Sequence, residues 1–264
     1  MLTIIGTGIQ AAGQLTIEAQ SCVQQADKLL YLVADAVTKQ LLHQLNATAE
    51  SIEDCYADGK DRFQSYLEMI ERILNPVRQG LDVCVAFYGH PGVFVYPSHE
   101  AIRLARLEGY VARMLPGISA EDCLFADLGV DPALTGCQSF ETTDFLIHRR
   151  KFDTSCSLVL WQVGVIGDVT FRSKGYSNDN LRVIVEYLEE FYDKSHNVFI
   201  YEASHYPIYN ARLEKLPLHD LAKASLTPIS TLYVPPNHTA PIDDDMLKRL
   251  GMARKQLHPV KLNL

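Results

Sequence analysis

The sequence lacks the features by which membrane and secreted proteins are usually identified. Spanning a bilayer takes about 20 consecutive apolar residues, and no run in the chain approaches that length. The first residues, 1–6, contain no positively charged segment and lead directly into a strand-like apolar run. This pattern predicts no signal peptide. We therefore expect a cytoplasmic protein with no membrane partner.

An excess of positive charge and a paired arrangement of cysteines are also absent. The 24 Lys and Arg residues are outnumbered by 32 Asp and Glu, and the net charge of -8 argues against a nucleic acid as the main partner. Since no CxxC pair occurs, we expect free thiols and no metal site. The six cysteines are Cys22, Cys55, Cys84, Cys123, Cys137 and Cys156.

What the sequence does contain is the pattern of an α/β protein with two domains. Its 264 residues, 47% of them hydrophobic, suffice for two modest globular domains. Strands and helices alternate in the first half, which favours a largely parallel sheet. The alternation weakens around 132–136, so we place domains at 1–132 and 133–240 and a tail at 241–264. Strands are predicted at 2–5, 29–33, 81–87, 110–114, 156–163, 198–202, 212–216 and 229–234, and helices at 13–24, 37–45, 61–77, 98–108, 119–128 and 180–192.

The stretch FYGHPGVF at residues 87–94 is the clearest functional signal. It begins at the end of a predicted buried strand, and its two glycines and proline let the backbone turn sharply and approach a small molecule closely. Tyr88 and His90 add polar groups to the turn. His90 is interpreted as a general base or a structural donor, with contact to a ligand favoured. The stretch predicts a ligand-binding turn at the edge of a sheet.

A second glycine turn, Gly6-Thr7-Gly8, follows the first predicted strand. Together with Ala11 it fits the looser form of the dinucleotide fingerprint, and Asp35 offers an acidic partner for a ribose. NAD binding is nevertheless disfavoured, because this motif is permissive and leaves the turn at 89–92 unexplained. We favour a different nucleoside-like ligand.

Polar aromatic residues and an arginine gather around the helix predicted from residue 61. Arg62 and Tyr66 are four residues apart and so share a face of that helix, and Tyr56 lies in the acidic loop just before it. The alternative interpretation is a core tyrosine with an arginine that extends outward. Apolar neighbours predict that this side of the helix is largely buried: Phe63, Leu67 and Ile70.

A third turn, at residues 116–122, leads into another predicted helix. Ser119 and Ala120 stand where a helix N-cap is expected, and Glu121 and Asp122 follow in the first turn. Backbone N–H groups at such an end also receive a carboxylate or hydroxyl of a ligand. Both interpretations, cap and ligand contact, can hold together.

The order of these turns resembles a known family. An early GTG, then FYGHPGVF, LPGISAEDCLFADLG, a strand ending in Gln162 and a late STLYVPP strand resemble the tetrapyrrole-methylase-like class of S-adenosylmethionine (SAM) methyltransferases. Within that class the chain is similar to the borosin peptide-backbone α-N-methyltransferases over about residues 1–240. The spacing of Tyr56, Arg62 and Tyr66 is the feature that separates this subfamily from the wider class.

The resemblance implies a fold, a cofactor and site residues. The implied fold is a two-subdomain α/β/α architecture with a mostly parallel N-terminal sheet, a mixed C-terminal sheet and SAM in the cleft between, the product being S-adenosylhomocysteine. It implies that Tyr56, Arg62, Tyr66 and Tyr88 are catalytic, with Tyr88 facing both cofactor and peptide. The implied SAM contacts are Tyr88, His90, Val93, Phe94, Ser119, Ala120, Gln162, Ser204 and Thr231.

The chain departs from the fungal members at two places. Those members carry a further tyrosine at the position of Glu53, and they continue into a clasp and a core peptide that they methylate on themselves. Since this sequence ends at Leu264, the resemblance is to the split bacterial type, which acts on a separate precursor peptide. A homodimer is implied, or a heterotetramer with two precursor chains.

The chemistry predicts that Tyr66 removes the amide proton, with Arg62 or Tyr56 stabilising charge on the amide oxygen. Two other functions stay open at this point. A tetrapyrrole (corrin or porphyrin) C-methyltransferase would share fold and cofactor. A catalytically silent peptide-binding module would bind SAM without turnover.

Overall fold

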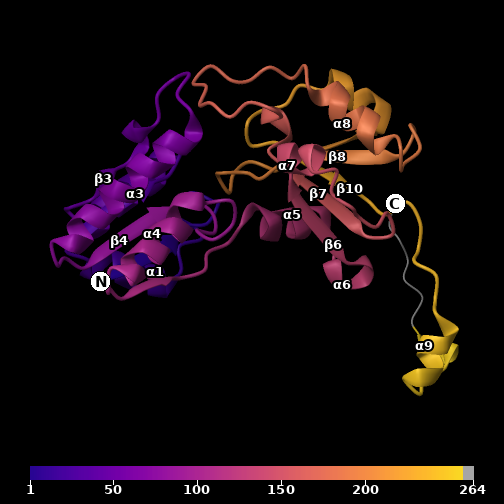
Figure 1. The fold of residues 1–264 in the computed structure, drawn as a ribbon, viewed down its shortest axis with the longest axis horizontal. Coiled ribbons are helices and arrows are strands. Elements are labelled where there is room, and N and C mark those ends of the chain that lie inside the picture. The colour runs from indigo at the N-terminus through magenta and orange to yellow at the C-terminus, as the bar shows by residue number, and fades with distance from the viewer. Residues whose placement is uncertain (258–264) are drawn as a thin grey trace. The chain divides into compact units, whose positions relative to one another are not determined.

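The computed structural model describes residues 1–257, which form two compact units (Figure 1). Unit 1 comprises Met1–Asp127 and two later segments, Val169–Lys174 and Ala203–Ala211. Unit 2 comprises Leu128–Asp168, Gly175–Glu202 and the described residues from Arg212 onward. The chain thus returns twice to unit 1 after leaving it. The division into 1–132 and 133–240 remains a prediction.

Unit 1 is built on a parallel sheet of five strands within the described residues, in the order β3-β2-β4-β1-β5. Every pairing in it is parallel, and β1 and β4 are buried along their whole length, as expected for central strands covered on both faces. The strands are β1 (Leu2–Gly6), β2 (Lys28–Leu32), β3 (Glu50–Ser51), β4 (Val83–Phe87) and β5 (Ala112–Met114).

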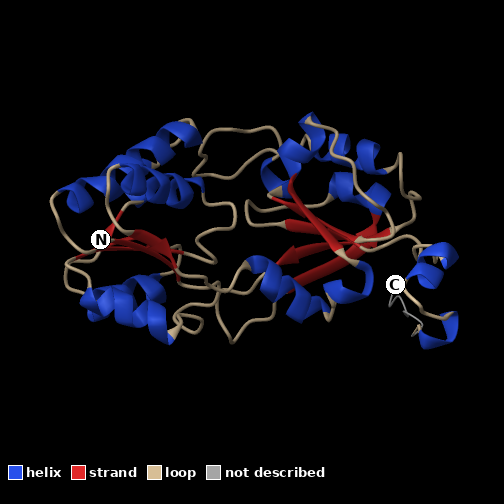
Figure 2. Cartoon of the chain, turned by 60° about the horizontal axis from the view of Figure 1, so that its bottom comes forward, coloured by secondary structure: helices blue, strands red, loops and turns tan. Residues whose placement is uncertain are grey.

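Helices cover both faces of this sheet (Figure 2). Buried residues of α3 and α4 form one apolar core with the sheet, and buried residues of α1 and α2 form another. This layering accounts for the alternation of helix and strand in the sequence. The helices are α1 (Ile17–Gln25), α2 (Ala36–Leu45), the 3₁₀ turn η1 (Glu53–Cys55), α3 (Arg62–Arg78), α4 (Tyr96–Leu107) and α5 (Ala120–Leu128).

Helix α3 begins as predicted, but two of the apolar residues in its first half are exposed. Asp61 caps it, with its carboxylate accepting from Phe63 N at 2.8 Å. The prediction that Phe63 and Leu67 mark the buried side is wrong, because they are 49% and 39% exposed. At about 100° per residue, Phe63 and Leu67 each lie about 20° around the helix from the buried Leu74, so their exposure comes from their place near the N-terminal end of α3 and not from the face they occupy. The stripe that is buried consists of Ser65, Met69, Ile70, Ile73, Leu74 and Val77.

Unit 2 is built on a mixed sheet of five strands within the described residues, in the order β6-β7-β10-β8-β9. β6 is parallel to β7, and the remaining pairs are antiparallel. In the core of unit 2, buried residues of α7 and α8 pack against the sheet. The elements are α6 (Pro132–Thr135), β6 (Cys137–Glu141), α7 (Thr142–Ile147), β7 (Ser157–Trp161), η2 (Val163–Val165), α8 (Leu181–Leu188), β8 (Asn197–Glu202), β9 (Arg212–Pro217), η3 (Leu218–Lys223), β10 (Thr231–Val234), α9 (Asp244–Arg249) and η4 (Arg254–Gln256).

The two sheets confirm the predicted fold class, a parallel N-terminal sheet followed by a mixed C-terminal one. The sequence did not predict β6 and α7, because β6 is an edge strand with no fully buried residue and little apolar signal. Two predicted helices are shorter than expected: α1 begins at Ile17, after its Thr16 cap, and α8 ends at Leu188. None of the helices in residues 1–257 has the length and apolar content to cross a bilayer.

Candidate active site

The turns after β1, β4 and β5 pack backbone against backbone in unit 1. A methyl group on Gly6 would lie 2.2 Å from the carbonyl oxygen of Gly89, and one on Gly117 would lie 2.9 Å from Gly6 Cα. Gly89 N–H also donates to Gly8 O at 2.8 Å. No side chain fits among these three turns. They therefore bring bare backbone together at the carboxyl edge of the parallel sheet, where α/β proteins bind ligands.

The structure gives Asp35 a role other than holding a ribose. Asp35 is the N-cap of α2, and its carboxylate accepts from Thr38 N at 2.6 Å. The acidic partner that a dinucleotide would need is thus engaged with the helix end. This finding weakens the NAD interpretation further.

The turn after β4 is held by its histidine. His90 Nδ1 accepts the Gly92 N–H at 2.9 Å, so in the neutral ring Nε2 carries the proton and is a donor. Two residues later the chain is strained: Phe94 has φ +55°, a conformation that bulky residues rarely adopt, and its side chain is 50% exposed. Val93 beside it is 36% exposed. Local strain of this kind concentrates at ligand sites.

The third turn confirms the helix-cap interpretation of Ser119. Its hydroxyl donates to Asp122 Oδ2 at 2.7 Å and accepts from Asp122 N at 3.2 Å, while its own N–H donates to the same carboxylate at 2.7 Å. The side chain is buried and its polar groups serve the start of α5. Contact of Ser119 and Ala120 with a ligand stays a prediction.

Tyr56 and Tyr66 come together as predicted, inside a row of aromatic rings. Their centroids lie 6.5 Å apart in an edge-to-face arrangement. The row continues on one side through Phe171, stacked 4.9 Å from Tyr56, and on the other through Tyr96, 6.2 Å from Tyr66. Phe63, 5.4 Å from Tyr96, ends it. The row thus brings together α3, α4, the loop before α3 and the later segment 169–174 of unit 1.

Two tyrosines of the candidate site, Tyr56 and Tyr88, have raised pKa values. Burial raises the pKa of Tyr56, and the charges of Tyr66 and Tyr88 and a hydrogen bond with Tyr66 raise it further, while Arg62 lowers it by less. Desolvation and then the charge of Tyr66 raise the pKa of Tyr88, although 52% of the surface of that residue is exposed. Both phenols therefore stay protonated at neutral pH and can donate hydrogen bonds.

A segment far along the chain fixes the loop that carries Tyr56. Residues 169–173 run beside it: Gly59 N donates to Phe171 O at 2.8 Å, and Phe171 N donates to Lys60 O at 2.8 Å. Asp58 also accepts from Ser173 N at 2.8 Å. Phe171, like Tyr96, is a residue of the row that sequence reasoning missed. No local pattern could have revealed it, since the pairing spans more than a hundred residues.

The remaining predicted residues lie in other parts of the chain. Ser204, in the last segment of unit 1, donates from its hydroxyl to Tyr206 O at 2.8 Å. Gln162 follows β7 in unit 2 with φ +58°, another strained position. Thr231 begins β10 and is 3% exposed. Their contact with a cofactor remains a prediction.

An open groove of about 520 Å³ lies along α4 and β5, and no predicted site residue lines it. Both arginines of the groove are hydrogen-bonded: Arg103 to Glu100 at 2.6 Å, and Arg106 to the Ala112 carbonyl at 2.8 Å.

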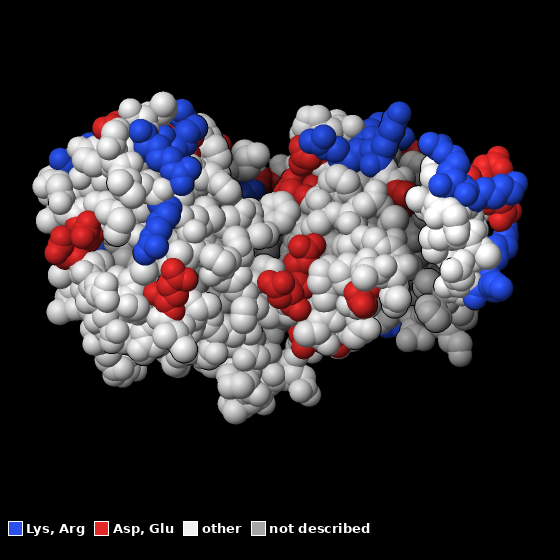
Figure 3. Space-filling model, turned by 90° about the horizontal axis from the view of Figure 1, so that it is seen from below, with Lys and Arg blue, Asp and Glu red and all other residues white. Residues whose placement is uncertain are grey.

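On the face seen in Figure 3, Lys and Arg gather in small separate groups. Within residues 1–257 there is also no group of three or more side chains suited to a metal ion.

Comparison with known proteins places these features in a family. The sequence matches the tetrapyrrole (corrin/porphyrin) methylases over residues 1–217. It is 42% identical over 264 residues to the methyltransferase and cyclic-peptide gymnopeptides precursor of Gymnopus fusipes, covering 98% of this chain and 63% of that protein. It is 42% identical over 255 residues to the corresponding omphalotin A precursor of Omphalotus olearius, covering 95% and 61%. The chain therefore spans less than two thirds of these relatives.

Solved structures share the fold at much lower identity. A cobalt precorrin-4 methyltransferase superposes with a TM-score of 0.60 at 18% identity, and the superposition covers 88% of this chain and 93% of that protein's chain. A uroporphyrin-III C-methyltransferase from Thermus thermophilus gives 0.63 at 17% identity, covering 89% and 91%. At these identities the likeness concerns the fold alone.

Proposed function

Because the chain belongs to the tetrapyrrole methylase family of SAM-dependent methyltransferases, we propose that it methylates backbone amide nitrogens of a peptide, as borosin enzymes do. Two relatives at 42% identity join a methyltransferase to a cyclic-peptide precursor, which supports a peptide substrate. The observation that carries the proposal is the meeting of Tyr56 and Tyr66, with Arg62 one turn before Tyr66 on α3.

The substrate sets the chemical requirement. A peptide nitrogen is a poor nucleophile, because its lone pair is delocalised into the carbonyl group. The N–H proton must leave, and the negative charge that develops on the amide oxygen must be stabilised. When bound, SAM supplies an electrophilic methyl group on a sulfonium. The residues of this chain must therefore provide a base, a donor and a rigid orientation.

The electrostatic surroundings assign roles to the tyrosines. Tyr56 and Tyr88, whose pKa values are raised, are suited to donate a hydrogen bond to the amide oxygen and to hold the peptide. We propose Tyr66, which meets Tyr56 in the row, as the base whose phenolate oxygen takes the amide proton. Arg62 shares the face of α3 with Tyr66 and favours negative charge near it. In this proposal Tyr66 is the base, Arg62 stabilises its negative charge, and Tyr56 and Tyr88 bind the peptide.

The turns of unit 1 fit a nucleoside-containing cofactor. The glycine backbones after β1, β4 and β5 would lie against it, and Val93 and Phe94 offer exposed apolar surface beside them. The family resemblance adds the other predicted SAM contacts: Tyr88, His90, Ser119, Ala120, Gln162, Ser204 and Thr231.

We further propose that the precursor peptide is a separate chain and that the enzyme is a homodimer, in a heterotetramer when two precursors bind. An extended peptide needs only a groove beside the tyrosine row, so it can reach the site without being part of the same chain. The relatives named above combine both functions in one polypeptide, and a test with separately supplied peptide decides between the two arrangements.

The first experiment incubates the purified chain with SAM and the small precursor protein encoded beside it, followed by tandem mass spectrometry. Mass gains of whole methylene units on backbone nitrogens are expected. Binding of SAM without any gain would contradict the proposal and direct attention to tetrapyrrole substrates, which solved proteins of this fold methylate according to their names.

Tyr66→Phe tests the proposed base. We expect kcat to fall at least about 100-fold, because a positioned base contributes 10²–10⁴-fold, with the Kd for S-adenosylhomocysteine nearly unchanged. The matched control is Tyr209→Phe, at a tyrosine of unit 1 that is 66% exposed. An equal loss of cofactor affinity in Tyr66→Phe would mean that the residue is structural.

A further inference from the structure

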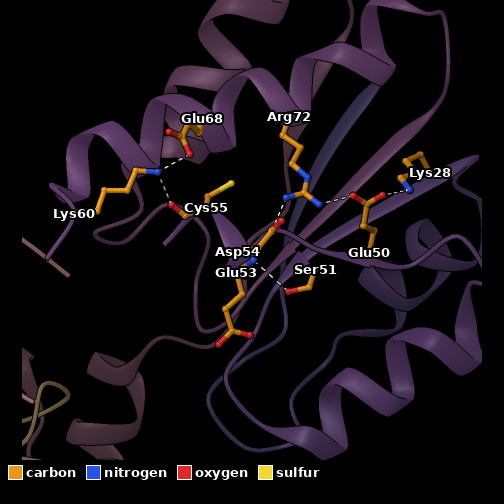
Figure 4. A network of polar contacts seen from close by, with 9 residues as sticks. All are labelled: Lys28, Glu50, Ser51, Glu53, Asp54, Cys55, Lys60, Glu68 and Arg72. Carbon is orange, nitrogen blue, oxygen red and sulfur yellow. Dashed lines mark hydrogen bonds and ion pairs between the residues drawn. The ribbon is translucent and has the colours of Figure 1, made fainter. Parts of the chain in front are cut away.

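A chain of alternating charges connects the loop before Tyr56 with α3 (Figure 4). Arg72 on α3 donates from Nη2 to Glu50 Oε1 at 2.5 Å and from Nη1 to Asp54 of η1. Lys28 on β2 pairs with the other oxygen of Glu50. The hydrogen bonds from Arg72 and then Lys28 lower the pKa of Glu50, so Glu50 is ionised at neutral pH. Arg72 thus bridges two carboxylates from the segment that leads into Tyr56.

Lys60 makes a second connection to the same loop. Its ammonium donates to the carbonyl oxygen of Cys55 at 2.8 Å and to Glu68 Oε2 at 2.5 Å (Figure 4). The Cys55 carbonyl belongs to the peptide unit that also contains the Tyr56 nitrogen, so Lys60 holds the backbone of Tyr56 itself. Glu68 lies on α3, six residues after Arg62.

Both connections end on the helix that carries Arg62 and Tyr66. We propose that Arg72 and Lys60 are positioning residues, which fix the backbone around Tyr56 against α3 and thereby set where the Tyr56 hydroxyl meets Tyr66 and the peptide. The inference rests on the proposed function, since it deepens the account of the same site. Neither residue touches the reacting atoms.

The arrangement suits positioning better than it suits stability alone. A guanidinium forms two directional hydrogen bonds at a fixed angle, so Arg72 defines the orientation of η1 as well as its distance from α3. Ring contacts such as the one between Tyr56 and Tyr66 are compatible with several geometries. Because a 1 Å misplacement can cost about 10²-fold in rate, a fixed backbone at Tyr56 matters for turnover.

The same helix offers a matched control. Arg78 on α3 also bridges two carboxylates, donating to Glu71 at 2.7 Å and to Glu108 at 2.6 Å. These bonds lie at the far end of α3 and do not include the residues around Tyr56. Arg78→Met therefore removes an equivalent ion-pair bridge from the same helix and leaves the Tyr56 loop intact.

The test compares Arg72→Met and Lys60→Met with Arg78→Met by two measurements. In protein labelled with ¹³Cζ-tyrosine, the Tyr56 resonance, assigned with Tyr56→Phe, is expected to shift in the first two variants and not in the third. In methylation assays, kcat is expected to fall about 10- to 100-fold in the first two, with KM and the Kd for S-adenosylhomocysteine within threefold. Arg72→Lys should recover part of the rate, because one carboxylate can still be bound.

Each outcome decides a specific point. An unchanged Tyr56 resonance in both variants would overturn the inference, as would a shifted resonance with unchanged kcat. A shifted resonance in a protein that methylates no peptide would leave the positioning intact and overturn the proposed function. If Arg72→Met does not fold, Lys60→Met and Arg72→Lys give the same two measurements. An equal loss of kcat in Arg78→Met would show a general effect of α3 stability.

Discussion

The turns after β1, β4 and β5 in unit 1 and the end of β8 in unit 2 are packed by different means. In unit 1 the turns after β1, β4 and β5 lie so close together that a methyl group on Gly6 would come within 2.2 Å of the Gly89 oxygen. In unit 2 the end of β8 is held by a half-buried carboxylate: Glu202 accepts from Thr227 Oγ1 and from Arg212 Nη1, each at 2.9 Å, and from the Ser230 hydroxyl. The three turns of unit 1 therefore depend on the absence of side chains, and the end of β8 depends on charge. Each dependence predicts its own way of failing.

Gly6→Ala should have the largest effect. The added methyl group would collide with the Gly89 oxygen and lie 2.8 Å from Pro91 Cδ, and backbone on both sides leaves little room to relax. We expect a loss of about 3 kcal/mol in the free energy of unfolding, the upper end for overpacking, and a matching loss of S-adenosylhomocysteine affinity. Chemical denaturation followed by circular dichroism and calorimetric titration measure the two.

Gly13→Ala is the control for this variant. Its added methyl group would find nearest neighbours at 3.8 Å, which is ordinary contact. Stability and affinity should stay close to those of the parent chain. If Gly6→Ala behaves like Gly13→Ala, the three turns are not packed as described, and the backbone-lined site is wrong.

Glu202→Gln tests the contrasting device in unit 2. Burial alone would raise the pKa of Glu202, but the hydroxyls of Ser230 and Thr227 and the guanidinium of Arg212 outweigh it and bring the pKa below its ordinary value. A carboxyl whose pKa is lower in the folded state stabilises the fold above its unfolded pKa of about 4.3. That stabilisation is lost as the pH falls through the folded pKa.

The expected result is therefore a pH-dependent difference. At pH 7 Glu202→Gln should lower the free energy of unfolding by about 1.5–3 kcal/mol, the range for hydrogen bonds to a charged group, and the difference should shrink below about pH 4. Fluorescence of Trp161, the single tryptophan, reports on unit 2 because it ends β7. A difference that does not shrink as the pH falls below about 4 would mean that the charge of Glu202 is not what stabilises the end of β8.

What the sequence could predict follows from how local each feature is. The glycine turns and the face shared by Arg62 and Tyr66 depend on residues within a few positions, and the structure bears out those patterns. The exposure of Phe63 and the stacking of Phe171 on Tyr56 depend on partners far along the chain. A periodicity identifies an apolar stripe, but only tertiary packing decides how much of the stripe's length is covered.

Glu53→Gln should have the smallest effect, although its position is where fungal members carry a tyrosine. Its carboxylate pairs with Lys39 at 2.8 Å, and the Glu53 side chain is 58% exposed. Exposed pairs of this kind contribute about 0–1 kcal/mol, since water and salt screen them. The free energy of unfolding should change by less than about 0.5 kcal/mol, and kcat by less than twofold, because the Tyr56 loop keeps its bonds to Arg72 and Lys60. Urea denaturation and the methylation assay measure both. A tenfold loss of kcat would show that η1 is positioned through Lys39 as well, and that the network around Tyr56 extends beyond α3 to α2.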